Sequence, residues 1–322
     1  MARLKEYNGH YCESEYEYAF IEFLEAEGWK YSSGNNISRV TKRDVLIADD
    51  FKKFIADTNP DLTEDEVIQI YDNVRLVGAE SDFATLHKVY GWMVNGVQFT
   101  PQDRLPRMIP LIEFDNWDKN IFRVVNQFTV EYTNNGQKEN RRADVLLFVN
   151  GIPLCVIELK NPADANATIY DAWEQINIRY WRDIPHLLHY CPLACISDGV
   201  KTRLGTVRTP YEHFYAWRRV NEGDVVSTLP FAETETMIKG IYTPERFVEI
   251  FRDYIYFQDS IYDCDEVEIV CRYPQFFAAK LLKQSIVNSV VTRSGKGGTY
   301  FGATGCGKTY TMAFLARQLA LR

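Results

Sequence analysis

The sequence predicts an α/β protein in which a mixed sheet is flanked by helices, with a second α/β unit beginning near its end. Three observations support this class. Helical apolar spacing dominates the first hundred residues, and β-branched and aromatic runs separated by turn signals fill residues 121–159. A glycine-rich loop then stands between an apolar stretch and a helical stretch close to residue 322.

Composition limits the class of protein further. At 322 residues the chain has room for two domains, and its 46% hydrophobic and 25% charged residues exclude a disordered or collagen-like chain. We find no apolar run long enough to span a bilayer and no secretory signal, so we expect a cytoplasmic protein without a membrane partner. The seven cysteines are scattered and odd in number, which favours reduced thiols.

The first elements are predicted to be helices. Residues 14–29 place Phe and Leu side chains at helical spacing and form an amphipathic helix. Residues 63–76 form a second helix, because Thr63 and Glu66 make a capping box ahead of an apolar run. A third helix is expected to start at Ser81.

The chain then changes to strands. Residues 121–132 are β-branched and aromatic, and Asn134–Gly136 is a turn signal. The runs 143–149 and 152–159 are joined by Asn150–Gly151, the strongest short-range signal for a hairpin. These residues therefore predict adjacent antiparallel strands.

The remaining elements alternate in type. We expect a helix at about 167–182, a strand at 193–197, and helices at 244–256 and 274–292. Residues 221–240 are polar and rich in turn signals, which marks a domain boundary. The predicted division is 1–230 for the first domain, 231–266 for a helical connector and 267–322 for the start of a further lobe.

The last segment matches a phosphate-binding loop. Residues 298–302 are expected to form a strand, and 308–321 a helix. The loop between them reads G-x-x-x-x-G-K-T, whose backbone N–H groups and helix N-terminus bind phosphate oxygens. The expected nucleotide-binding residues are Gly302, Thr304, Gly305, Cys306, Gly307, Lys308 and Thr309, with Lys308 on the β/γ-phosphates and Thr309 on Mg²⁺.

Little of an ATPase follows this loop. About a dozen residues remain after Thr309, in one helix, without the acidic residue that an ATPase carries on a later strand. We therefore expect an N-terminal piece of a longer motor protein, which binds nucleotide weakly and does not hydrolyse it.

Three charged residues stand at the ends of otherwise apolar strands: Asp144, Glu158 and Lys160. Charges in buried strands need a partner. One interpretation is a surface ion pair of little energetic weight. The other is a catalytic metal site, in which Asp144 and Glu158 offer the hard oxygens that Mg²⁺ prefers and Lys160 stabilises an attacking hydroxide.

Strand register decides between these interpretations. A two-residue turn that pairs Val149 with Ile152 would set Asp144 opposite Ile157, and the two carboxylates would face opposite sides of the sheet. A metal site therefore requires a three-residue connection or a bulge, either of which would put Asp144 opposite Glu158. Pro153 favours an irregular pairing because it has no N–H to give to the ladder.

These residues resemble a known motif. Arg142-Ala143-Asp144, followed by Ile157-Glu158-Leu159-Lys160, resembles the PD…(D/E)xK nuclease motif, and more closely the R subunit of type I restriction enzymes. The resemblance implies an α/β nuclease core followed by a RecA-like translocase lobe. It also implies Mg²⁺ at the nuclease site and ATP in the full-length protein.

Further positions follow from the resemblance alone. A glutamate of the family's first helix lies near the metal, which implies Glu17, with Glu15 and Glu22 as alternatives. A Q-x-x-x-Y element implies Gln175, but Tyr180 comes one residue late, which in a regular helix is a rotation of about 100°. A glutamine that reads adenine in this helicase superfamily implies Gln275.

The resulting expectation is an Mg²⁺-dependent DNA endonuclease domain of a restriction–translocation subunit, whose partners are duplex DNA and the methylation and specificity subunits. Despite a net charge of −8, residues 200–220 are basic and are expected to bind DNA phosphate. The residues concerned are Lys201, Arg203, Arg208, Arg218 and Arg219. Two alternatives remain: a repair helicase–nuclease that acts on DNA ends, and a motor whose carboxylate pair is a relic.

Overall fold

The computed structural model describes residues 13–78, 80–161, 168–227, 231–258 and 266–320. Its α-helices are α1 (Glu13–Ala26), α2 (Ala48–Thr58), α3 (Glu64–Arg75), α4 (Asp82–Asn95), α5 (Ile169–Glu174), α6 (Trp181–Asp183), α7 (Pro185–Leu188), α8 (Ala232–Ile241), α9 (Pro244–Asp253), α10 (Tyr273–Thr292) and α11 (Lys308–Ala320). A π-helix, η3 (Gln175–Tyr180), joins α5 to α6, and short 3-10 helices are η1 (Gly34–Asn36), η2 (Trp117–Lys119) and η4 (Tyr211–His213). The strands are β1 (Lys30–Ser33), β2 (Val97–Phe99), β3 (Arg107–Ile109), β4 (Phe122–Asn134), β5 (Gln137–Val149), β6 (Ile152–Leu159), β7 (Leu193–Ser197), β8 (Thr202–Thr206), β9 (Ile255–Gln258) and β10 (Val267–Val270).

A six-stranded mixed sheet forms the centre of the molecule, in the order β1-β4-β5-β6-β7-β8. The pairs β1–β4 and β6–β7 are parallel, and the other neighbours are antiparallel. The parallel β6–β7 step needs a crossover, which α5, η3, α6 and α7 supply. The predicted α/β class with a mixed sheet is confirmed.

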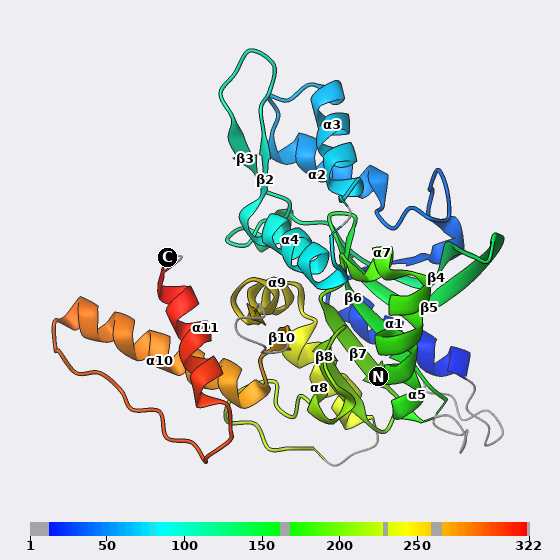
Figure 1. Cartoon of the computed structure of the whole chain (residues 1–322). Helices are drawn as coiled ribbons and strands as arrows, with labels where there is room; N and C mark the ends of the chain where they lie inside the picture. Colours follow the sequence, from blue (N-terminus) through cyan, green and yellow to red (C-terminus); the bar gives the residue numbers. More distant parts are fainter. Residues whose placement is uncertain (1–12, 79, 162–167, 228–230, 259–265, 321–322) are drawn as a thin grey trace.

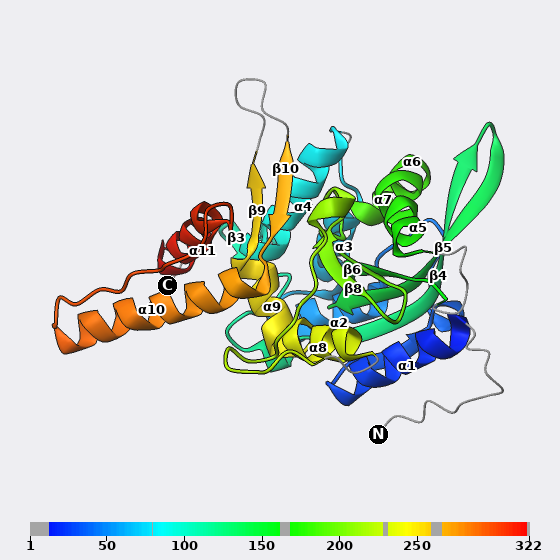
Figure 2. The ribbon, with the colours of Figure 1, turned by 90° about the horizontal axis from the view of Figure 1, so that it is seen from below.

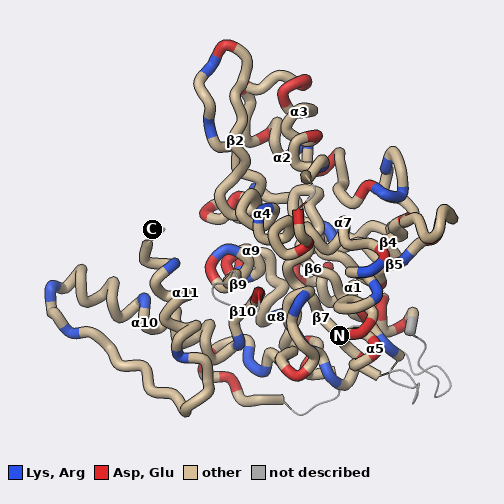
Figure 3. Tube along the Cα trace, viewed as in Figure 1, with Lys and Arg blue, Asp and Glu red and all other residues tan. Residues whose placement is uncertain are grey.

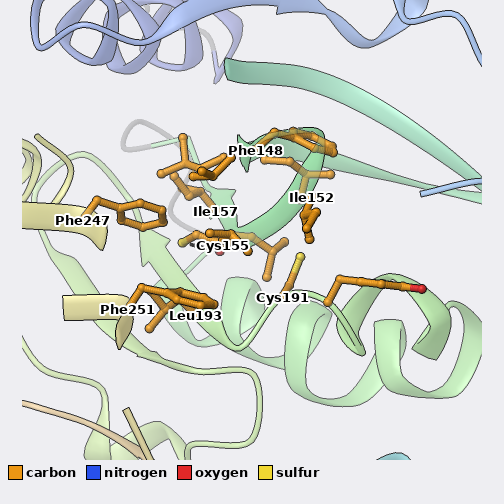
Figure 4. Packing of buried hydrophobic residues seen from close by; sticks show 14 of the residues in the cluster. Phe148, Ile152, Cys155, Ile157, Cys191, Leu193, Phe247 and Phe251 are labelled. Atoms are coloured by element: carbon orange, nitrogen blue, oxygen red, sulfur yellow. Dashed lines mark hydrogen bonds between the residues drawn. The ribbon is translucent and has the colours of Figure 1, made fainter. Parts of the chain in front are cut away.

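Helices cover both faces of this sheet. Figure 2 shows α1 and α8 below the strands and α5, α6 and α7 above them. On the lower face, Cys155 and Ile157 of β6 pack near Phe247 and Phe251 of α9, as Figure 4 shows. β6 is buried along its whole length, which explains its continuous apolar run.

The expected helices and hairpins are present. Thr63 and Glu66 form the predicted capping box of α3, and Ser81 caps α4. Asn150–Gly151 connects β5 to β6 with both residues at positive φ (52° and 75°), as a two-residue hairpin turn requires. The helix α2 was not predicted, although Phe51, Phe54 and Ile55 of this helix are buried at helical spacing.

The segment after residue 230 is helical. Residues 221–240 are rich in turn signals, and the helical connector is predicted to start at residue 231; residues 232–241 form α8, whose Met237, Ile238 and Ile241 are buried. Trp29, between β1 and α1, donates a hydrogen bond to the Tyr242 carbonyl oxygen (2.5 Å) and packs edge-on against Phe247. This part of the chain is therefore packed against the sheet, while the predicted domain limits stay a prediction.

The C-terminal part projects away from the sheet (Figure 1). The strand expected at residues 298–302 is wrong, because that stretch has no regular secondary structure. A strand requires a hydrogen-bonding neighbour, and the described residues offer none beside it. The helix that follows the glycine-rich loop, α11, is present, although Leu321 lies outside the described residues.

Two simpler expectations concern cysteines and membrane segments. Cys155, Cys191, Cys195, Cys271 and Cys306 are free thiols, and Cys12 and Cys264 lie outside the described residues. Within the described ranges, no helix is long and apolar enough to cross a bilayer.

Candidate active site

A bulge brings the two strand-end carboxylates together. Val149 pairs with Ile152, as the turn dictates, but after a shift between Leu147 and Phe148 the register becomes Val145 with Ile157. One extra residue of β6 is thereby accommodated, and continuing this register places Asp144 opposite Glu158. The Asp144 carboxylate also accepts a hydrogen bond from the backbone N–H of Leu159 (2.9 Å). The predicted irregular pairing is confirmed.

Glu158 is fully buried between the sheet and the crossover helices. Its Oε1 accepts a hydrogen bond from the Tyr180 hydroxyl (2.5 Å), and its Oε2 accepts one from the Gln175 amide (2.6 Å). Burial, together with the adjacent Asp144 carboxylate, raises the pKa of Glu158 well above its ordinary value. The site therefore holds two close acidic groups, and the pKa of one of them is raised by burial and by the other.

Lys160 belongs to the same cluster. Its ammonium group donates a hydrogen bond to Oε1 of Gln175 (3.1 Å), the residue whose amide nitrogen contacts Glu158. The charge of Lys160 also lowers the pKa of Glu158, although less than burial raises it. Gln175 thus fixes the lysine and the buried glutamate relative to each other.

Tyr180 reaches the site because η3 is a π-helix. In a regular α-helix Tyr180 would be rotated away from Gln175 by about 100°. A π-helix closes its hydrogen bonds over one additional residue, so the fifth residue takes the place that the fourth has in an α-helix. The Tyr180 hydroxyl consequently contacts Glu158, the Gln175 amide (3.0 Å) and the carbonyl oxygen of Arg142 (3.1 Å). The sequence spacing alone gave no signal for this π-helix.

Glu17 takes a position beside this cluster. It is 5% exposed on α1, and its carboxylate accepts hydrogen bonds from the side-chain amides of Asn126 (2.6 Å) and Gln127 on β4. Gln127 has a left-handed φ of 54°, uncommon for a residue with a side chain, and the β4–β5 register sets it beside Asp144. Gln127 was not identified from the sequence as a residue whose side-chain amide contacts Glu17. The assignment of Glu17 to the metal site stays a prediction.

The donor set fits a hard divalent cation. Asp144 and Glu158 present carboxylate oxygens side by side, and their mutual repulsion is the kind that a bound cation relieves. Across the described part of the chain, no group of three or more His, Cys, Asp or Glu residues has a metal-holding arrangement. A two-carboxylate site suits Mg²⁺, which keeps several waters and takes only one or two carboxylates.

The glycine-rich loop contacts Gln275. Both are more than a hundred residues after the carboxylate cluster in the sequence. Gln275, buried at the start of α10, donates a hydrogen bond from its amide to the Gly307 carbonyl oxygen (3.2 Å). Lys308 donates to the carbonyl oxygens of Gly302 (2.8 Å) and Ala303 (2.9 Å). Thus Gln275 and the loop are neighbours, while the nucleotide-binding roles predicted for residues 302–309 remain untested.

The basic residues of 200–220 are spread out. Arg208 lies over the rings of Phe83 (5.3 Å) and Trp181 (5.7 Å) and near Glu266 (4.0 Å). Of the other four basic residues in this stretch, two have a polar partner and two are exposed. Arg203 lies 3.9 Å from Glu233, and Arg219 donates a hydrogen bond to the Glu222 carbonyl oxygen (3.0 Å), whereas Lys201 and Arg218 are both exposed. Their predicted role in DNA binding stays a prediction.

The fold and the cluster define an α/β protein with a buried acidic pair, a lysine and a glutamine at the end of two antiparallel strands. Residues 11–213 match the family described as the N terminus of the type I restriction enzyme R protein. Because this match covers more than half of the sequence, the chain belongs to that family.

Similar proteins carry related names. The chain is 29% identical over 331 residues to a Methanocaldococcus jannaschii protein named for the endonuclease subunit of the type I restriction enzyme MjaIXP, covering 94% of this chain and 31% of that protein. It is 27% identical over 327 residues to the Haemophilus influenzae type I restriction enzyme HindI endonuclease subunit, with 95% and 30% covered. It is 26% identical over 214 residues to a Staphylococcus aureus type I restriction endonuclease subunit, with 66% and 20% covered. The chain thus spans about a third of the length of the first two relatives.

Proposed function

We propose that this chain is the Mg²⁺-dependent DNA endonuclease domain of a type I restriction subunit, with its active site at Asp144, Glu158 and Lys160. One observation carries the proposal: a β-bulge sets two carboxylates opposite each other, next to a lysine, in a chain of the restriction-subunit family. The same residues would be scattered if the hairpin kept a regular register.

Each residue has a chemical role in phosphodiester hydrolysis. Asp144 and Glu158 would hold the cation, which when bound supplies Lewis-acid polarisation of the phosphate and an activated water. The Lys160 ammonium would stabilise negative charge that develops on the phosphoryl oxygens. Gln175 orients both Lys160 and Glu158, and Tyr180 favours the ionised form of Glu158 by donating to its Oε1.

We also propose that residues 302–309, with Gln275, form part of an ATP site that is completed by further sequence. The loop stands at the N-terminus of α11, and a helix N-terminus is a favourable place for a phosphate group. In this proposal ATP drives DNA translocation in the whole protein. Methylation and specificity subunits would supply the recognition of sequence.

Cleavage of supercoiled plasmid tests the nuclease proposal. The chain, in Mg²⁺ or Mn²⁺, should nick or linearise plasmid, and Glu158→Gln should abolish the product. Glu268→Gln is the matched control, because Glu268 is also a buried strand carboxyl but lies on β10. Equal cleavage by the Glu158→Gln variant and the wild type would refute the proposed site.

A further inference from the structure

We propose that duplex DNA is held against this domain by the loop 38–43 together with the far end of the β4–β5 hairpin, residues 133–142. We call these two segments together the ribbon surface. The inference rests on the proposed nuclease function and adds the path that the DNA takes to the carboxylate site.

The hairpin projects from the body of the molecule. Figures 1 and 2 both show β4 and β5 extending beyond the other strands of the sheet as a two-stranded ribbon. Its end is rich in amides and cations that are exposed, and its one acidic residue, Glu139, accepts hydrogen bonds from Tyr132 and Asn134. A two-stranded β-ribbon fits the major groove of B-DNA, and Asn, Gln and Arg side chains are its common readers.

The ribbon starts at the catalytic cluster. Arg142 precedes Asp144 by two residues, and its carbonyl oxygen accepts the hydrogen bond of the Tyr180 hydroxyl that also contacts Glu158. At about 3.3 Å per residue, the ribbon end lies roughly 25–30 Å from Asp144, which is within one turn of a duplex. DNA lying along the ribbon therefore passes beside the carboxylates.

The loop 38–43 adds fixed positive charge beside the ribbon. It contains Arg39, Lys42 and Arg43 and no acidic residue. The Lys42 carbonyl oxygen accepts a hydrogen bond from the backbone N–H of Glu131 (3.0 Å), which ties the loop to β4. Figure 3 shows Lys and Arg positions gathered on this loop and beside the β4 and β5 labels.

Side-chain contacts hold the loop 38–43 in a defined turn. The Asp44 carboxylate accepts hydrogen bonds from the backbone N–H (2.9 Å) and hydroxyl (3.1 Å) of Thr41, and it pairs with Arg75 (3.3 Å). The Arg39 guanidinium lies over the Phe128 ring (3.9 Å). Lys42 and Arg43 consequently point outward from an ordered turn, so that little entropy is lost when they bind phosphate.

These cations are available to a ligand. Among the described residues, Lys42, Arg43 and Arg142 form no ion pair with a carboxylate, and all three are exposed. By contrast, Arg203 and Arg208 of the 200–220 stretch already lie within 4.0 Å of glutamates. On a protein with a net charge of −8, a cluster of unpaired cations beside the active site favours a polyanion as its partner.

The test is duplex DNA binding by the chain, measured by fluorescence anisotropy at several salt concentrations in Ca²⁺. We expect the Lys42→Ala/Arg43→Ala variant to bind about tenfold or more weakly at 0.1 M salt. Its log–log salt slope should be shallower by about two, since each lost phosphate contact removes about 0.9. Gln137→Ala/Lys138→Ala, at the ribbon end, should also bind more weakly.

The matched control is Arg293→Ala/Lys296→Ala, which removes two exposed cations just after the end of α10 and should leave the affinity unchanged. Unchanged binding by the Lys42→Ala/Arg43→Ala variant would overturn the ribbon surface, as would a wild-type chain that binds no duplex. A titration of Mn²⁺ into the same variants is independent of DNA. A loop variant that binds Mn²⁺ as the wild type does is folded. If the wild-type chain itself does not bind Mn²⁺, the nuclease proposal has failed, independently of the proposal for the ribbon surface.

Discussion

Replacing Tyr180 with Phe tests the role of the π-helix in the metal site. The substitution keeps the ring and removes one hydroxyl, which donates to Glu158 Oε1 at 2.5 Å. Because this hydrogen bond favours the ionised carboxylate, its loss raises the pKa of Glu158 further. A divalent cation must displace the proton, so we expect weaker metal binding.

The magnitude follows from the geometry of this contact. A hydrogen bond to a charged group is worth about 1.5–3 kcal/mol. The protonated carboxyl keeps part of that contact, so a difference of about 1.4 kcal/mol, or a tenfold loss in apparent affinity, is expected near neutral pH. The difference in Mn²⁺ affinity between the variant and the wild type should decrease as the pH rises, because protons no longer compete with the cation above the pKa of Glu158.

Calorimetric titration of Mn²⁺ into the wild type and the Tyr180→Phe variant, at two pH values, measures both effects. Tyr190→Phe is the matched control, since Tyr190 is also buried and its hydroxyl donates to the Val74 carbonyl oxygen (2.7 Å) away from the site. Both variants should lose roughly 1 kcal/mol of unfolding free energy. Equal Mn²⁺ affinity in the Tyr180→Phe variant and the wild type would refute the reasoning.

Three further predictions concern the same site and its support. Because the pKa of Glu158 is raised in the folded state, the contribution of this residue to the stability of the metal-free chain should be fully present below the unfolded pKa, about 4.3, and should be lost as the pH rises through the folded pKa; Glu158→Gln should remove this contribution to the pH dependence of stability in urea titrations. Gly151→Ala should cost about 2–4 kcal/mol in the same assay, since Gly151 has a φ of 75° and a Cβ there would overlap the Ile47 carbonyl oxygen; a smaller loss than about 1 kcal/mol would contradict the turn geometry. Lys160→Met should retain Mn²⁺ binding and lose plasmid cleavage, and a variant that still cuts at the wild-type rate would remove Lys160 from the mechanism.

Local signals in the sequence were sufficient for much of the fold. The capping box at Thr63 and Glu66 and the hairpin turn at Asn150–Gly151 are chemical requirements that residues two or three positions apart impose. The bulge was one of the two irregularities that a metal site requires, and Pro153, which has no N–H to give to the ladder, was the local signal for it.

Features that depend on distant partners were not predictable. The π-helix at Gln175–Tyr180 is associated with contacts of Tyr180 with Glu158 and the Arg142 carbonyl oxygen, which no local spacing reveals. The strand expected at residues 298–302 has the right composition but no neighbour to pair with in the described chain. The buried side of α8 is set by packing on α1 and β8, which the polar composition of this segment does not reveal.

The central claim is that the bulged hairpin builds a metal site from Asp144 and Glu158. Its most direct test is calorimetric titration of Mn²⁺ into the wild-type chain, the Glu158→Gln variant and the Glu268→Gln control. Glu268 is equally a buried strand carboxyl, so both variants remove one carboxylate from the interior. We predict that the wild type and the Glu268→Gln variant bind Mn²⁺ alike and that the Glu158→Gln variant does not bind it. Equal binding by all three proteins, or by none, would contradict the assignment of the site.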